Sequence, residues 1–152
     1  MKRRVPNTLL LLFVLIATTA QSQSTTGAKA KLFSSFPSKI TCVQAELSKV
    51  FTTTVDENVS LAFSDNFLFS GVIISNVTKY SNLQTVIIKA SFFDDAIFAL
   101  SKITSADNTI SYVGRIITKK YFDGYQLTKD EFNNYQLIKI ETDNVIQDCS
   151  QN

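Results

Sequence analysis

Between residues 40 and 50, apolar residues recur with a helical period. They lie three or four positions apart and alternate with polar residues: Ile40, Val43, Leu47 and Val50. Ser38 follows Pro37 and has the side chain of an N-cap. The spacing therefore predicts a helix from about residue 38 to residue 51.

From residue 58 onward the pattern changes to the strict alternation of strands. Val59, Leu61 and Phe63 share one face of the first such segment. Seven segments follow this pattern or are apolar on both faces: 58–63, 66–80, 82–92, 95–104, 109–118, 122–130 and 133–142. The links between them are short and predict antiparallel hairpins, since a parallel crossover needs a dozen residues or more.

These elements predict an α+β protein. We expect one N-terminal helix packed on a twisted antiparallel β-meander of about six or seven strands, with a partly closed β-barrel as the alternative. Gly71, inside a long apolar segment, indicates a bulge or close packing. Asp123-Gly124 has the composition of a tight turn.

The first twenty residues have the three parts of a secretory signal peptide. The basic start "MKRRVPNT" precedes the apolar run Leu9–Ala17, and small residues follow at Thr18 and Ala20. The apolar run is half the ~20 residues that a membrane span requires. We therefore expect a signal peptide at 1–20, a flexible polar arm at 21–35 and one β-rich domain at 36–152. We expect secretion or a periplasmic location, with no stable membrane span once the leader is removed.

Leader removal changes the charge of the chain. The full sequence has 15 basic and 13 acidic residues, and loss of Lys2, Arg3 and Arg4 leaves 12 basic against 13 acidic. A net charge of about −1 argues against nucleic-acid binding, which needs clustered basic side chains.

The chain has two cysteines, Cys42 and Cys149, and an even count in an exported protein favours a disulfide. The bond would close a ring of about 100 residues, which the chain-entropy model values at roughly 4–5 kcal/mol. We predict the Cys42–Cys149 bond, with two separate thiols as the alternative.

The composition narrows the chemistry of the chain. It contains no histidine, so a Ser-His-Asp or Cys-His arrangement within the chain is excluded. Asp94-Asp95 and Ser101-Lys102 are adjacent pairs, and neighbours on a strand point to opposite faces. The acidic loops do not match a calcium-binding pattern. We therefore predict no catalytic residues, no metal site and no cofactor.

A binding surface is best sought where aromatic and basic side chains lie together, because tyrosine and arginine are over-represented at interface hot spots. The candidates are Lys79, Tyr80, Lys119, Lys120, Tyr121 and Tyr125. Tyrosine at strand ends is also common in sheet packing, which is the competing interpretation.

Several strings between residue 60 and residue 150 resemble a group of small uncharacterised secreted proteins of Bacteroidetes-type bacteria. They are "SGVIISNVTKYSNLQTVIIK", "ISYVGRI", "DGYQL" and "VIQDC". The resemblance implies export from a Gram-negative cell and brings no catalytic residue with it.

Three functions remain open from the sequence. The first is a non-enzymatic exported protein that binds an unknown protein or an envelope component. The second is an extracytoplasmic hydrolase or hydrolase inhibitor. The third is a small-ligand carrier, which would need an apolar cavity of several hundred Å³.

Overall fold

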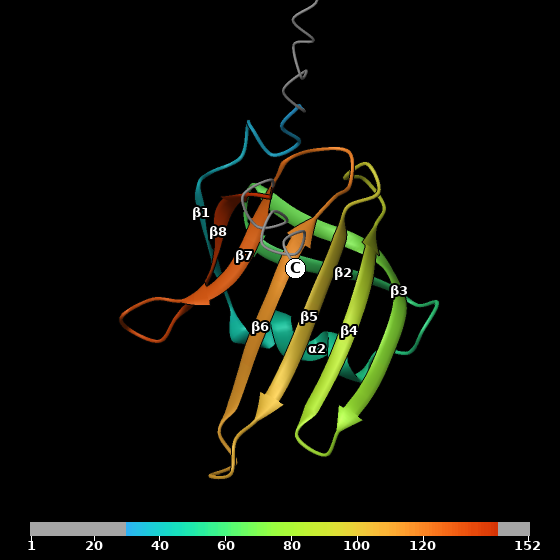
Figure 1. Ribbon diagram of the computed structural model, residues 1–152, viewed down its shortest axis with the longest axis vertical. Coiled ribbons are helices and arrows are strands. Elements are labelled where there is room, and N and C mark those ends of the chain that lie inside the picture. The colour runs from blue at the N-terminus through green and yellow to red at the C-terminus, as the bar shows by residue number, and fades with distance from the viewer. Residues whose placement is uncertain (1–29, 143–152) are drawn as a thin grey trace, which may run out of the picture.

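The computed structural model describes residues 30–142, which form one eight-stranded antiparallel sheet (Figure 1). The strands are β1 (Lys39–Cys42), β2 (Asn58–Ser64), β3 (Phe67–Tyr80), β4 (Leu83–Ala90), β5 (Ile97–Thr104), β6 (Ile110–Ile117), β7 (Asp123–Lys129) and β8 (Tyr135–Glu141). A short helix α2 (Gln44–Lys49) and a 3₁₀ turn η1 (Val50–Thr52) connect β1 to β2. The predicted antiparallel meander is confirmed in outline, with eight strands in place of six or seven.

The order of the strands nearly closes the sheet into a barrel. From one edge to the other it runs β1-β8-β7-β6-β5-β4-β3-β2. The two edge strands, β1 and β2, approach each other without pairing, so the sheet curls almost into a ring. Sheet twist allows this closure, and it protects edges that would otherwise pair with other chains. The barrel alternative is therefore the better description of the fold.

The predicted helix at 38–51 is wrong in its first half. Residues 39–42 form strand β1, in which Ile40 and Cys42 face the core and alternate with exposed residues. The helix covers only Gln44–Lys49, and its N-cap is Val43, not Ser38. The helical spacing was misleading for two reasons. Ile40 is buried as part of a strand that pairs with β8, and Val43, which the helix would have buried, is 58% exposed.

The core fills the barrel with the inward residues of every strand. Phe67, Phe69 and Ile73 of β3 pack with their counterparts on β4 to β8. The register of β3 against β4 shifts between Ile73 and Ser75 and again between Thr78 and Tyr80, not at Gly71. A Cβ at Gly71 would collide with the backbone oxygen of Lys89, so this glycine serves close packing.

Asp123-Gly124 is not a turn, contrary to the sequence prediction. Both residues are buried at the start of β7, where Asp123 pairs with Glu141 and Gly124 with Ile140. The Asp123 side chain is only 1% exposed and faces the segment that precedes β1.

Residues 30–38, here called the strap, are held against one end of the barrel through their main chain. The Asp123 carboxylate accepts hydrogen bonds from the N–H groups of Leu32 at 2.7 Å and Phe33 at 2.8 Å. The Lys139 ammonium donates to the carbonyls of Phe33 at 2.7 Å and Phe36 at 2.6 Å. Residues 30–35 of the expected flexible arm are therefore bound to the domain. The remainder of that arm, 21–29, lies outside the described residues, as does the expected signal peptide.

Phe33 anchors the strap in the core. Its ring is fully buried and lies with Phe36, Phe67, Phe93 and Tyr125, at centroid distances of 5.2 to 6.3 Å. The hydroxyl of Tyr125 donates to the Pro37 carbonyl at 2.6 Å. This end of the barrel is therefore filled by aromatic side chains.

Cys42 is buried, and its Sγ lies 3.7 Å from the carbonyl oxygen of Ile40. Burial raises the pKa of its thiol to about 12. Residues 30–142 contain no disulfide, and Cys149 lies outside the described residues. The Cys42–Cys149 bond therefore stays a prediction. Within 30–142 no helix combines the length and the hydropathy that crossing a membrane requires.

Candidate ligand-binding pocket

The structure places the sequence-predicted binding residues in three locations. Lys79 and Tyr80 end β3, whereas residues 119–121 lie in the loop between β6 and β7. These locations are at opposite ends of the barrel, separated by the length of a strand such as β4, roughly 23 Å at ~3.3 Å per residue. Tyr125 is fully buried in the aromatic cluster under the strap. The candidates therefore do not form one surface.

At the end near residues 119–121, Lys120 joins an exposed ion-pair cluster. Its ammonium lies 2.7 Å from Asp94 and 3.6 Å from Asp95, and Asp95 also pairs with Lys89 at 3.1 Å. Hydrogen bonds from Lys120 and Tyr121 lower the pKa of the Asp94 carboxyl. Such exposed pairs contribute little to stability because water and salt screen them.

The two carboxylates of this cluster correct an expectation from the sequence. If Asp94 and Asp95 lay on a strand, their side chains would point to opposite faces; Asp at a strand start is also ordinary in turns. Instead they lie in the loop before β5, with positive φ values of 34° and 60°, and both reach Lys120. Asp tolerates this left-handed backbone better than most residues, and it lets neighbouring side chains converge.

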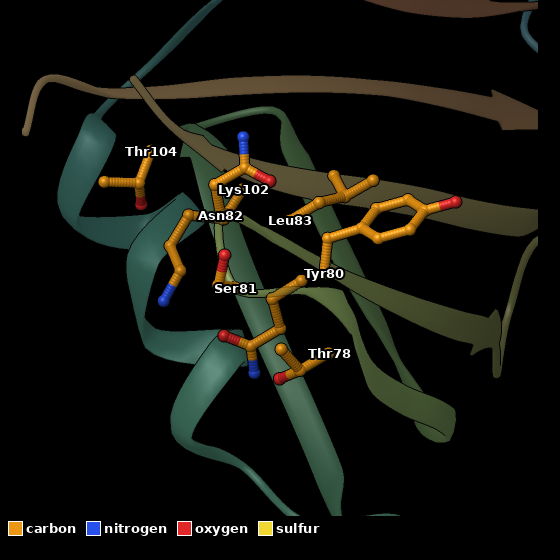
Figure 2. A pocket seen from close by; sticks show the side chains of 8 residues that line it. Thr78, Tyr80, Ser81, Asn82, Leu83, Lys102 and Thr104 are labelled. Carbon is orange, nitrogen blue, oxygen red and sulfur yellow. The ribbon is translucent and has the colours of Figure 1, made fainter. Parts of the chain in front are cut away.

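The other end of the barrel has a shallow pocket of about 200 Å³ (Figure 2). Side chains from the β3–β4 hairpin and from the end of β5 surround it, and the ring of Tyr80 runs beside Leu83, away from the Lys102 ammonium. The lining consists of Thr78, Tyr80, Ser81, Asn82, Leu83, Gln84, Lys102 and Thr104. Most of these side chains carry hydroxyl, amide or ammonium groups that form hydrogen bonds.

The pocket exists because the inward faces of β3, β4 and β5 become polar where these strands extend past the core. Thr78 lies opposite Gln84, and Gln84 lies opposite Lys102, so the three form one row across the sheet. The next inward position toward the core is apolar and buried in both neighbouring strands: Val86 in β4 and Leu100 in β5. The row therefore marks the mouth of the barrel.

Ser101 and Lys102 point to opposite faces, as the sequence predicted. The Ser101 hydroxyl is 2.9 Å from that of Thr85 on the outer face of the sheet. The Lys102 ammonium lies on the inner face, 5.2 Å from the ring centre of Phe51 in η1. This cation–π contact holds the ammonium beside the pocket.

An amide network connects the pocket to η1. Gln84 Nε2 donates to the Phe51 carbonyl and to Asn76 Oδ1, both at 2.9 Å. Asn76 Nδ2 in turn donates to the Thr53 carbonyl at 2.8 Å. These bonds satisfy carbonyls at the end of η1 and fix the position of Gln84.

Lys102 is the cation of the pocket. It forms no ion pair with a carboxylate from the part of the chain that the structure describes. The ring of Tyr80 is 68% exposed and lies with Leu83 on the other face of the hairpin. The arrangement is therefore suited to a small ligand that carries hydrogen-bonding groups and a negative charge.

Sequence reasoning identified Tyr80 but missed Gln84, Asn76 and Lys102 as parts of one site. A signal was present, because Gln84 and Lys102 are polar residues at inward positions of otherwise apolar strands. Recognising it required the register that puts them opposite each other.

Comparisons with protein-family models, curated proteins and solved structures found no match to this chain.

Proposed function

We propose that this chain is an exported, non-enzymatic binding protein that holds a small polar group of its partner in the pocket beside Tyr80. The observation that carries the proposal is the row Thr78–Gln84–Lys102 at the barrel mouth. Hydroxyl, amide and ammonium groups in a concave site are the means by which ligands are oriented and selected.

Binding is better supported than hydrolysis. Hydrolysis of a glycosidic bond would use two carboxyl groups, one of them with a raised pKa. Asp94 and Asp95 converge, but they are exposed at the far end of the barrel, and their lysine partners lower the pKa of both. They are therefore held as carboxylates that pair with lysines.

Binding at the pocket is also better supported than carriage of an apolar ligand inside the barrel. The end of the barrel under the strap is occupied by Phe33 and the rings around it. At the other end, Phe51 of η1 packs against Tyr112 at 5.7 Å between ring centres. A ligand therefore has access to the mouth rather than to the interior.

The proposal includes export, for which the sequence supplies the leader pattern. In the periplasm or outside the cell, the available partners are proteins and envelope components. A polar group of an envelope component, such as a sugar, matches the hydroxyl and amide groups of the lining.

The test measures binding of the protein to an immobilised envelope polysaccharide fraction. We expect Lys102→Ala to weaken binding and Lys119→Ala, a lysine change at the opposite end, to leave it unchanged. Equal effects of the two changes, or no effect of Lys102→Ala, would contradict a role for the pocket.

A second candidate is contact with a protein through the loop between β4 and β5, as in an inhibitor. It is supported by Phe92, whose side chain is 83% exposed in that loop. Crosslinking in the native envelope fraction would test it, since Phe92→Ser should abolish a crosslinked product that Tyr80→Ala retains.

A further inference from the structure

We propose that the C-terminal segment 143–152 packs across the outer face of the barrel beside the strap, where Val145 and Ile146 cover a row of isoleucines. The segment follows Thr142, the last described residue. Thr142 lies at the strap end of the barrel and the pocket at the other end, so this proposal does not depend on the proposed function.

Four positions of the outer face form one row across neighbouring strands at this end (Figure 1). Ile140 of β8 pairs with Gly124 of β7, and Ile117 of β6 pairs with Ile97 of β5. A Cβ at Gly124 would lie 3.5 Å from Cγ2 of Ile117, which joins the two pairs. The isoleucine row is therefore Ile140, Gly124, Ile117 and Ile97, with a notch where the glycine has no side chain.

The isoleucine row leaves apolar surface uncovered by the described residues. Ile117 is 41% exposed, and Ile140 and Ile97 are half-buried on the outer side of strands whose alternate residues form the core. Removal of apolar surface from water is favourable in proportion to its area. A glycine within a strand also lets another segment approach the sheet closely, here at Gly124.

Thr142 fixes where the segment begins. Its N–H donates to the Phe122 carbonyl at 2.6 Å, and the residue is only 4% exposed. The end of the barrel beside it is closed by the strap, in which Lys31 pairs with Glu141 at 3.0 Å. The segment therefore cannot enter the barrel here, whereas the isoleucine row begins on the outer face two residues earlier, at Ile140.

The sequence of the segment, "DNVIQDCSQN", places its apolar pair at the right distance. Val145 and Ile146 are three and four residues beyond Thr142, which an extended chain covers in roughly 10–14 Å. Ile117 lies two strands from β8, roughly 10 Å at the spacing of paired strands. The pair can therefore reach the notch at Gly124 and the exposed side of Ile117.

This arrangement keeps the two cysteines apart. With Ile146 beside Ile117, five residues along the strands and three strand spacings separate it from Cys42, roughly 22 Å in all. Three residues and the Cα–Cα distance of a disulfide together span at most about 18 Å, which is too short for Cys149 to reach Cys42. The proposal therefore requires two separate thiols, the alternative to the predicted bond.

The first experiment is NMR of the full chain with labelled isoleucine and valine methyl groups. We expect nuclear Overhauser contacts from the methyl groups of Val145 or Ile146 to those of Ile117. Contacts between Ile117 and Ile97, which pair in the structure, serve as the internal control. Control contacts without any contact from the segment to the isoleucine row would overturn the proposal.

Two serine variants measure the same contact by urea denaturation. Ile117→Ser and Ile146→Ser should each raise the unfolding equilibrium constant roughly tenfold, because each removes part of one apolar contact. The double variant should show less than the product of the two effects. Ile110→Ser is the matched control: Ile110 is also 41% exposed on β6 but lies seven residues from Ile117, and its loss should change the constant by about twofold or less.

The remaining outcomes overturn the proposal and leave the pocket in place. Equal effects of Ile117→Ser and Ile110→Ser, or no effect of Ile146→Ser, would show that the segment does not cover the isoleucine row. If a second copy of the chain covers it, the effect of Ile117→Ser will depend on protein concentration while Ile146→Ser has none. A mass that rises by two hydrogens on reduction would show a Cys42–Cys149 bond, which the proposed path of the segment does not allow.

Discussion

The attachment of the strap to Asp123 allows a quantitative prediction. Asp123→Asn keeps the shape of the side chain, but it removes the charge and replaces one acceptor oxygen by an NH₂ group. That NH₂ group cannot accept a hydrogen bond. One of the two bonds to the carboxylate, from the Leu32 N–H at 2.7 Å or from the Phe33 N–H at 2.8 Å, would therefore be lost. Hydrogen bonds to charged groups contribute ~1.5–3 kcal/mol, and a buried donor without a partner costs ~1–3 kcal/mol. We expect a loss of about 3 kcal/mol in the free energy of unfolding.

Urea denaturation, followed by circular dichroism, measures this loss. With an m-value of ~2 kcal/mol/M, 3 kcal/mol shifts the midpoint by roughly 1.5 M. Asp65→Asn, the same change at an exposed turn, is the matched control and should leave the midpoint in place.

Phe33→Ala extends the test to the anchor of the strap. It should cost ~3–5 kcal/mol, as expected for truncation of a buried aromatic residue. If both residues act by holding the same strap, the double variant should lose much less than the sum of the single losses. A change below 0.5 kcal/mol for Asp123→Asn would show that its hydrogen bonds do not hold the strap. Strictly additive losses would show that Asp123 and Phe33 do not act through the same segment.

Four further predictions concern the sheet, the thiol and the mouth of the barrel. Gly71→Ala should destabilise the fold by ~1–3 kcal/mol or more in urea denaturation, because the new Cβ meets the backbone oxygen of Lys89. With Cys42 as a thiol, the free energy of unfolding should fall as the pH rises from about 9 toward 12, since the unfolded thiol ionises first; Cys42→Ala should reduce that slope. At pH 8 iodoacetamide should not modify Cys42 until the protein is unfolded, as read by mass spectrometry, and native modification would contradict its burial. Gln84→Leu should cost ~1–2 kcal/mol in thermal unfolding because it removes the 2.9 Å donor of the Phe51 carbonyl and leaves only the longer bond from Asn76 Nδ2 at 3.4 Å; a neutral effect would show that the Gln84 amide does not stabilise η1.

Local patterns predicted the β-rich part of this fold well. The alternation in β2 and β5, and the short links between consecutive strands, indicated antiparallel hairpins, which the structure contains. These features are readable because strand period and hairpin length depend on neighbouring residues alone. The opposed faces of Ser101 and Lys102 followed from the same period and are confirmed.

Predictions failed where one local pattern fits two structures. The spacing that suggested a helix at 38–51 includes Ile40, which is in fact a core residue of β1. Asp123-Gly124 has the composition of a turn, yet Asp123 is a buried acceptor for the strap. Asp is common in turns, and its less frequent role as a buried acceptor has no sequence pattern of its own.

The sequence by itself determined strands β2 to β8 in outline and their antiparallel direction. The tertiary structure decided that β1 pairs with β8, that the strap covers one end, and that Gln84 and Lys102 meet at the other. The physical reason is that β1 and the strap contribute mainly their own backbone groups, which pair with the backbone of β8 and with the side chains of Asp123 and Lys139, about 100 positions away in the chain. Every residue carries those groups, so they leave no pattern in the side chains, and only the closed sheet shows which of them pair.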